Sequence, residues 1–151
     1  MTNAAVFAAA FIALYVAHSV GDHWVQTSHQ AQAKGRPGWS GRLADARHVL
    51  GLTISKGIAL TAVVLVLDLP VTVLGITAGL GVDAASHWWA DRRTTLARLA
   101  ALTGKAEFYA LGSKVTDDNG HPTHLGTGAY ALDQSFHHLF LGIAALLIAT
   151  L

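Results

Sequence analysis

The sequence predicts an all-α membrane protein: a four-helix transmembrane bundle with one interfacial helix on the cytoplasmic side. Hydrophobic residues make up 52% of the 151 positions and charged residues only 13%, and the mean hydropathy is +0.43. A soluble domain would carry about 25% charged residues. Four apolar segments are each about 20 residues long, enough to cross a hydrocarbon layer of about 30 Å. A chain of this length forms a single domain.

The first predicted span covers about residues 4–26 and the second about residues 48–67. Because the start Met1-Thr2-Asn3 carries no basic residue, we expect a retained span rather than a cleaved secretory signal. Residues 28–47 contain four basic residues and several glycines, so this stretch is expected to be a loop, with a helix starting near Ser40.

The third predicted span covers about residues 70–91 and the fourth about residues 129–151. The short reversal at residues 68–70 makes spans two and three antiparallel neighbours. Gly75, Gly79 and Gly81 predict the close approach of another helix to span three. Residues 92–128 are expected to form a second long loop, which begins with an amphipathic helix at the membrane surface over residues 92–102.

Charge predicts the orientation of these spans. Nine of the ten Lys and Arg residues lie in the two long loops. We expect the protein in the cell inner membrane, and the positive-inside rule then places both loops in the cytoplasm and both termini on the outer side. Trp24, Trp88 and Trp89 fall at the same cytoplasmic ends, where aromatic side chains favour the interface.

Composition also excludes some functions and partners. A net charge of +1 argues against a nucleic-acid partner, since no basic face could neutralise many phosphates. The absence of cysteine excludes disulfides and thiolate metal sites. Nine histidines against one methionine indicate imidazole chemistry. The expected partners are membrane lipids and, for a homo-oligomer, a second copy of the chain, and no protein partner can be named.

Ionisable residues recur every four positions in three of the predicted spans, which places them along one face of each helix. These residues are His18 and Asp22; Asp83, His87 and Asp91; and Asp133 and His137. At about 1.5 Å per residue, the deeper ones in each span lie roughly 6 to 12 Å inside the cytoplasmic boundary. A carboxylate in hydrocarbon costs at least about 2.5 kcal/mol. We therefore expect these side chains to meet at one level in the bundle interior.

Converging aspartates repel one another unless a cation lies between them, so the stripes predict a divalent metal site. Mixed imidazole and carboxylate ligands suit zinc first, with manganese or iron as alternatives. In one alternative, four or five of the seven residues bind a single ion and the others form a second layer around these ligands. In the other, the residues surround a dinuclear centre. His48, at the boundary of span two, is either a further ligand or proton shuttle, or only a helix-end histidine. Lys56, deeper in that span, either extends to the surface or faces the site as an anion clamp or counter-ion.

The order His18-x3-Asp22-x3-Gln26, then His87-x3-Asp91, then Asp133-Gln134-x2-His137 resembles a family of small bacterial and phage integral-membrane proteins of unassigned function. That family is distantly similar to membrane-bound metal-dependent hydrolases. The resemblance implies a multi-span membrane protein with a His/Asp site.

Three functions fit these observations. In the first, a metal-dependent hydrolase cleaves a phosphoester or a lipid-linked substrate at the cytoplasmic leaflet, with Asp22 or Asp83 as general base and Lys56 or Arg92 holding an anionic head group. In the second, the buried His and Asp residues form the proton or metal-ion path of a transporter or channel component. In the third, a structural metal fastens the bundle, and the cytoplasmic loops bind partners.

Overall fold

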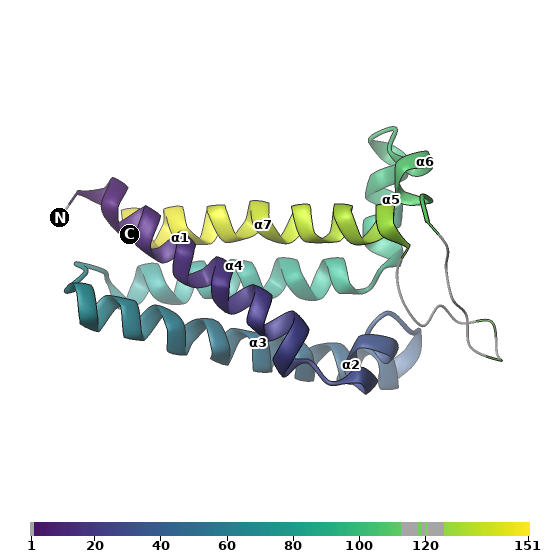
Figure 1. The fold of residues 1–151 in the computed structure, drawn as a ribbon, viewed down its shortest axis with the longest axis horizontal. Helices are drawn as coiled ribbons and strands as arrows, with labels where there is room; N and C mark the ends of the chain where they lie inside the picture. The colour runs from purple at the N-terminus through teal and green to yellow at the C-terminus, as the bar shows by residue number, and fades with distance from the viewer. Residues whose placement is uncertain (1, 113–117, 119, 121–125) are drawn as a thin grey trace.

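The computed structural model describes residues 2–112, 118, 120 and 126–151, and all of their regular secondary structure is helical (Figure 1). The all-α prediction is therefore confirmed. Within the predicted loop 92–128, residues 113–117, 119 and 121–125 lie outside the described part of the chain.

Four long helices make up the body of the fold: α1 (Asn3–Val20), α3 (Gly38–Leu67), α4 (Val73–Asp91) and α7 (Thr127–Thr150). Helix α1 packs against α3 and α7, and α4 packs against the same two helices. Both chain ends and the turn between α3 and α4 lie at one end of these helices (Figure 1). Near that end the core is apolar, with Leu14, Leu60, Leu141 and Ile148 buried together.

Three helical segments are long and apolar enough to cross a membrane: Asn3–Val25, Gly38–Leu67 and Thr127–Thr150. Helix α4, the third predicted span, is not one of them. Its apolar stretch ends at Val82, and its second half carries Asp83, His87 and Asp91. By length and composition, three of the four predicted spans are therefore supported.

The first predicted span is not a uniform α-helix. Helix α1 ends at Val20 and continues as η1 (Gly21–Val25), one turn of π-helix. The backbone N–H of Gln26 donates to the carbonyl oxygen of Gly21 at 2.9 Å, which closes this wider turn. Such turns within helices are frequent at functional sites, and this one carries Asp22.

The expected loop at residues 28–47 is largely helical, which corrects the prediction. Helix α2 (Ser28–Ala33) begins with a reciprocal capping box between Thr27 and Gln30, a pattern that satisfies two free backbone donors. Helix α3 then begins at Gly38, close to the expected start near Ser40. The basic residues of this stretch therefore extend from helices or from the short link between them.

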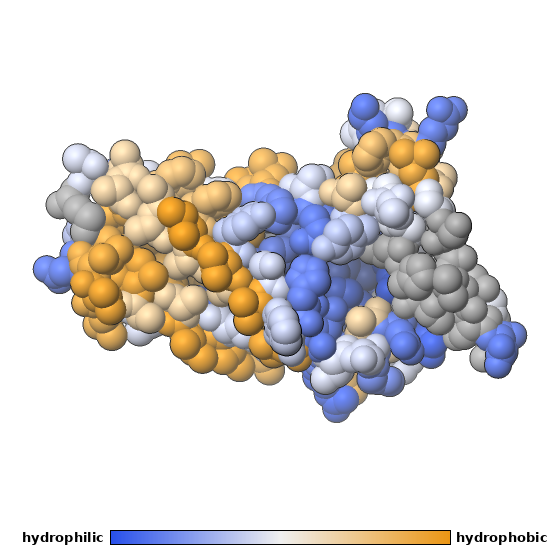
Figure 2. All heavy atoms as spheres, in the orientation of Figure 1, coloured by the Kyte–Doolittle hydropathy of each residue, from blue (hydrophilic) through white to orange (hydrophobic). Residues whose placement is uncertain are grey.

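Helices α5 (Thr94–Leu102) and α6 (Ala106–Tyr109) follow α4 and lie, like α2, away from the chain termini (Figure 1). Helix α5 buries Leu96 and Ala100 on one side, so the amphipathic helix expected at residues 92–102 is present. On the face shown in Figure 2, apolar side chains cover the half that holds the termini and polar ones gather over the other half.

Glycines set the contact between α4 and α7. A Cβ atom on Gly79 would lie 2.7 Å from the carbonyl oxygen of Ala144, and one on Gly75 would lie 3.2 Å from that of Ile148. The predicted close approach is confirmed at these two positions. Nothing in the described part of the chain lies within 4 Å of a Cβ on Gly81, which does not contribute.

Candidate metal centre

Seven of the eight predicted ligand residues meet at one level of the fold, where α1, η1, α3, α4 and α7 come together. They are His18, Asp22, His48, His87, Asp91, Asp133 and His137. The four imidazoles are only 1% to 2% exposed. The four-residue spacing and the common depth thus predicted which side chains of three helices meet here. His48 adds a side chain from a fourth helix, α3.

One group whose donor atoms lie close enough to hold an ion consists of Asp22, His48 and His87. The Nε2 atoms of His48 and His87 are 3.2 Å apart. Oδ1 of Asp22 lies 3.2 Å from Nε2 of His48 and 3.7 Å from Nε2 of His87. Three donor atoms from three different segments thus face a common point.

Asp91 offers a further oxygen to the same two imidazoles. Its Oδ2 lies 3.4 Å from Nε2 of His48 and 3.3 Å from Nε2 of His87. Two ligands about 2.1 Å from one ion lie about 3.4 Å apart at a tetrahedral angle. All five of these separations, from 3.2 to 3.7 Å, are close to this value, and Asp22 and Asp91 themselves belong to different triplets of donor atoms that could hold an ion. We call these four residues, Asp22, His48, His87 and Asp91, the inner group.

The inner group also leaves buried oxygen atoms without partners. Oδ1 of Asp22 and Oδ2 of Asp91, the two oxygens that face the imidazoles, accept no hydrogen bond from the described residues. A buried polar atom without a hydrogen bond costs about 1–3 kcal/mol, and more when it is charged. A divalent cation beside the two imidazoles is a partner that such an oxygen lacks.

A second triplet, His87, Asp91 and His137, also has donor atoms close enough to hold an ion. Nε2 of His137 lies 3.5 Å from Oδ1 of Asp133 and 3.9 Å from Oδ1 of Asp91. Asp133 and His137 therefore belong to the same cluster but lie beside the inner group rather than within it.

His18 is in the cluster but outside both triplets. Because a carbonyl oxygen cannot donate, its Nε2–H donates to Oε1 of Gln134 at 3.3 Å. The Gln134 amide in turn donates to Oδ2 of Asp22 at 3.4 Å and to Oδ2 of Asp133 at 3.5 Å. His18, predicted as a ligand, and Gln134 thus form a hydrogen-bonded layer beside Asp22 and Asp133, as second-layer groups often do at metal sites.

Lys34, which the sequence did not single out, reaches the cluster from the C-terminal end of α2. Its Nζ lies 2.9 Å from Oδ1 of Asp91. Burial alone would lower the pKa of Lys34, but the carboxylates of Asp91 and Asp22 outweigh it and raise that pKa above its ordinary value of 10.5. The capping-box pattern of Thr27 and Gln30 is a signal that could have indicated α2, but no pattern in the sequence pairs Lys34 with Asp91.

Two consecutive arginines at the end of α4 hold this segment in place. The guanidinium of Arg92 donates to the carbonyl oxygens of Lys34 and Arg36, and Arg93 donates to that of Ala31 at 2.8 Å. Arg92 also lies 3.7 Å from Asp45. Arg92 therefore fixes backbone that positions Lys34, and its predicted contact with a substrate head group finds no support in these contacts.

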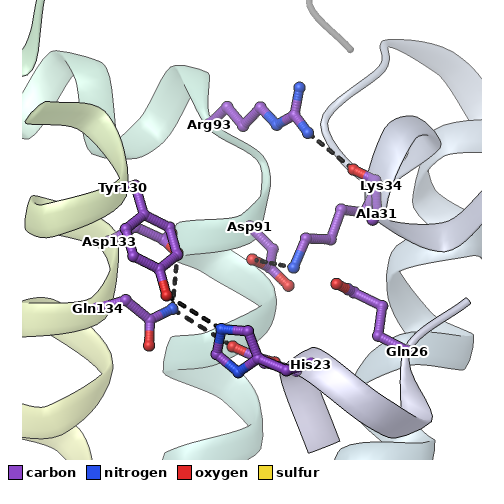
Figure 3. A pocket seen from close by; sticks show the side chains of 10 residues that line it. His23, Gln26, Ala31, Lys34, Asp91, Arg93, Tyr130, Asp133 and Gln134 are labelled. Carbon is purple, nitrogen blue, oxygen red and sulfur yellow. Dashed lines mark hydrogen bonds and ion pairs between the residues drawn. The ribbon is translucent and has the colours of Figure 1, made fainter. Parts of the chain in front are cut away.

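A cavity of about 270 Å³ opens beside the cluster. Its wall consists of Asp22, His23, Gln26, Ala31, Lys34, Asp91, Arg93, Tyr130, Asp133 and Gln134. Figure 3 shows Lys34 and Asp91 meeting inside it, with His23, Tyr130 and Gln134 grouped on another side. His23, which is exposed, accepts a hydrogen bond at Nε2 from the Tyr130 hydroxyl at 3.0 Å, because its Nδ1–H donates to the Ser19 carbonyl oxygen.

Asp83, predicted as a ligand and as a base, is in neither group of donor atoms that could hold an ion. Its Oδ2 lies 2.6 Å from Nζ of Lys56, and the two residues are 2% and 0% exposed. Asp83 lies one helical turn closer to the chain termini than His87. Of the roles expected for Lys56, the structure supports that of counter-ion rather than that of anion clamp.

The chain matches no protein-family model, no curated protein and no solved structure.

Proposed function

We propose that this protein is a membrane-embedded, metal-dependent hydrolase that cleaves a phosphoester, including a lipid-linked one, at the cytoplasmic leaflet. One observation carries the proposal: the wall of the cavity contains carboxylates that can hold a metal, Asp22 and Asp91, together with two cations, Lys34 and Arg93. A substrate in this cavity would contact both the metal centre and groups that bind an anion.

The proposed membrane position follows from the helices. Three candidate spans, with α4 packed between two of them, would form a four-span bundle. The step from Asn3 to His18 corresponds to about 22 Å of helix, and that from His137 to Thr150 to about 20 Å. Against a hydrocarbon layer of about 30 Å, the centre would lie some 8 to 10 Å from the cytoplasmic boundary.

Zinc is the metal proposed for the inner group, with manganese or iron as alternatives, because two imidazoles and two carboxylates suit all three ions. A divalent ion lowers the pKa of a coordinated water toward neutrality and polarises a phosphoryl oxygen. Asp22, predicted as a general base, is better placed as a ligand, since its Oδ1 faces both imidazoles.

Charge makes substrate binding depend on the metal. The carboxylates of Asp22, Asp91 and Asp133 outnumber the two cations of the cavity wall, so a phosphate would be repelled from the metal-free protein. A divalent ion reverses this balance. Lys34 and Arg93 would then bind the non-reacting phosphoryl oxygens, a contact for which a guanidinium is well shaped.

In the proposed reaction, the oxygen of water bonds to phosphorus, and the ester P–O bond breaks with its electron pair on the leaving oxygen. One proton of the water ends on the leaving oxygen, so the products are an alcohol and inorganic phosphate or a phosphomonoester. The hydrogen-bonded pair of His23 and Tyr130 at the cavity offers a path by which the proton can move.

A transport path is less well supported by the structure. The Lys56–Asp83 pair lies one helical turn from the candidate centre, on the side of the chain termini. Beyond it, in the residues that the structure describes, the interior is the apolar core of Leu14, Leu60 and Leu141. An ion path through one copy of the chain would end there.

The test is hydrolysis by protein purified in detergent, with p-nitrophenyl phosphate and a diacylglycerol phosphate in mixed micelles as substrates. We expect metal-loaded protein to release product and chelator-treated protein to be inactive until metal is restored. Lys34→Met should raise KM more than it lowers kcat, while Lys105→Met, on the exposed surface, should change neither. A metal-loaded protein that hydrolyses neither substrate would contradict the proposal.

A further inference from the structure

We propose that the centre holds two metal ions, the second bound by Asp133, His137 and Oδ1 of Asp91, and that this second ion faces the cavity. We call these three residues the outer group. The inference rests on the proposed metal centre and adds to it the number of ions and the ion that meets the substrate.

The two groups are joined by a pair of stacked imidazoles. The rings of His87 and His137 are nearly parallel, at an angle of 15°, with centroids 3.8 Å apart. The Nε2 atom of His87 belongs to the inner group and that of His137 to the outer group. Both Nε2 atoms lie beside the Asp91 carboxylate, and parallel rings whose nitrogens point the same way direct them at two positions about 3.5–4 Å apart, the usual spacing of two-metal sites.

Asp91 bridges the same two positions. Its Oδ2 lies 3.3 Å from Nε2 of His87, whereas its Oδ1 lies 3.9 Å from Nε2 of His137. A carboxylate that gives one oxygen to each of two ions holds them at a fixed separation. Asp133 completes the outer group, with its Oδ1 3.5 Å from Nε2 of His137.

Two further observations indicate a cation at the outer position. Nε2 of His137 is buried and forms no hydrogen bond with any residue in the described ranges. The ammonium group of Lys34 already lies 2.9 Å from Oδ1 of Asp91, so a positive charge occupies part of this position. A divalent ion there would displace the ammonium into the cavity, where it would be free to meet a phosphate.

Both positions border the cavity. Its wall includes Asp22 of the inner group, Asp133 of the outer group and Asp91, which the two groups share, and the imidazoles of the two groups are not among the residues of its wall. The outer group supplies three protein donors, which leaves a position open as catalytic sites do. A substrate in the cavity would meet this open position.

The experiment measures manganese bound per protein chain, by mass spectrometry after loading and gel filtration in detergent, together with the electron paramagnetic resonance spectrum. We expect two equivalents and a spin-coupled spectrum for the wild type. His137→Ala and the isosteric Asp133→Asn should each retain one equivalent with an uncoupled spectrum. His138→Ala, the adjacent histidine that lies outside both groups, should retain two. Circular dichroism selects the folded variants.

The possible results separate the two proposals. One equivalent of manganese in the wild type, unchanged in Asp133→Asn and lost in His87→Ala, would overturn the proposal of an outer ion and leave that of the inner ion. Two equivalents that persist in both His137→Ala and Asp133→Asn would overturn the assignment of these residues to the second ion. A wild type that binds no manganese, zinc or iron would overturn the proposed function itself.

Discussion

Asp22 and Asp91 divide their carboxylate oxygens in the same way. Each directs one oxygen at the imidazoles of His48 and His87. The other oxygen faces an outer partner: Lys34 for Asp91, and the Gln134 amide for Asp22. An outer partner fixes the orientation of a ligand before the metal arrives, and its loss typically weakens metal binding without removing the site.

Gln134→Leu tests this outer layer. We expect the affinity for zinc to fall by about 10- to 100-fold with the number of bound ions unchanged, because Asp22 loses its orienting donor but keeps its ligand oxygen. Titration against a competing chelator measures the change, and Ser135→Ala, on the exposed side of the same helix turn, is the control. Complete loss of metal, or no change in affinity, would contradict the assigned role.

Sequence patterns predicted which residues meet at the centre, but they did not predict which of these residues contact one another. Four-residue spacing and common depth predicted that His18, Asp22, His87, Asp91, Asp133 and His137 would meet. The same spacing also included Asp83, which pairs with Lys56, because a periodic pattern cannot show which carboxylate a long lysine will reach from another helix. Lys34 was missed because it comes from the stretch with the strongest loop signals, where tertiary contacts with Arg92 and Arg93 decide the path.

At the scale of secondary-structure elements, the helices that carry the site were predictable, but their ends and their irregularities were not. Apolar length predicts α1, α3 and α7, yet the π-turn at Gly21–Val25 has no distinct sequence pattern, since it depends on how η1 packs against α3. Helix α4 is held by its neighbours on both sides, through glycine contacts with α7 and through the ion pair of Asp83 with Lys56 of α3.

The buried ion pair between α3 and α4 should stabilise the fold only as a pair. Removing one partner of a buried pair leaves an uncompensated charge, so Lys56→Met should lower the free energy of unfolding by about 3–5 kcal/mol. The double variant Lys56→Met/Asp83→Leu should recover most of this loss. Thermal unfolding in detergent measures both, and the folded double variant should keep its metal. A double variant without metal would place Asp83 back among the ligands.

At the scale of the whole molecule, the face shown in Figure 2 divides into an apolar half, where the chain termini lie, and a more polar half. Helices α2 and α5 lie away from the termini (Figure 1), and Ala31 of α2 and Lys34 at its end line the cavity. This division fits a protein that meets water, or the head groups of one leaflet, on the side where its reactive groups lie.

The proposed orientation can be tested by cysteine labelling, since the chain contains no cysteine. Single cysteines at Thr2 and Thr150 should react with an impermeant maleimide on intact cells from which any outer membrane has been stripped. Those at Ser40 and Thr103 should react only after the cells are broken. All four positions are exposed on the protein. The reverse pattern would place the cavity on the outer side of the membrane.

The most direct test of the proposed metal centre is metal K-edge X-ray absorption on the protein loaded with a single equivalent of zinc. We expect a shell of nitrogen and oxygen ligands at about 2.0–2.1 Å, with the multiple-scattering signal of two imidazoles. That signal should fall in His48→Ala and in His87→Ala, and His29→Ala, on the exposed helix α2, should leave it unchanged. Zinc that fails to bind, or a spectrum that is the same in all of these variants, would contradict a metal centre built on His48 and His87.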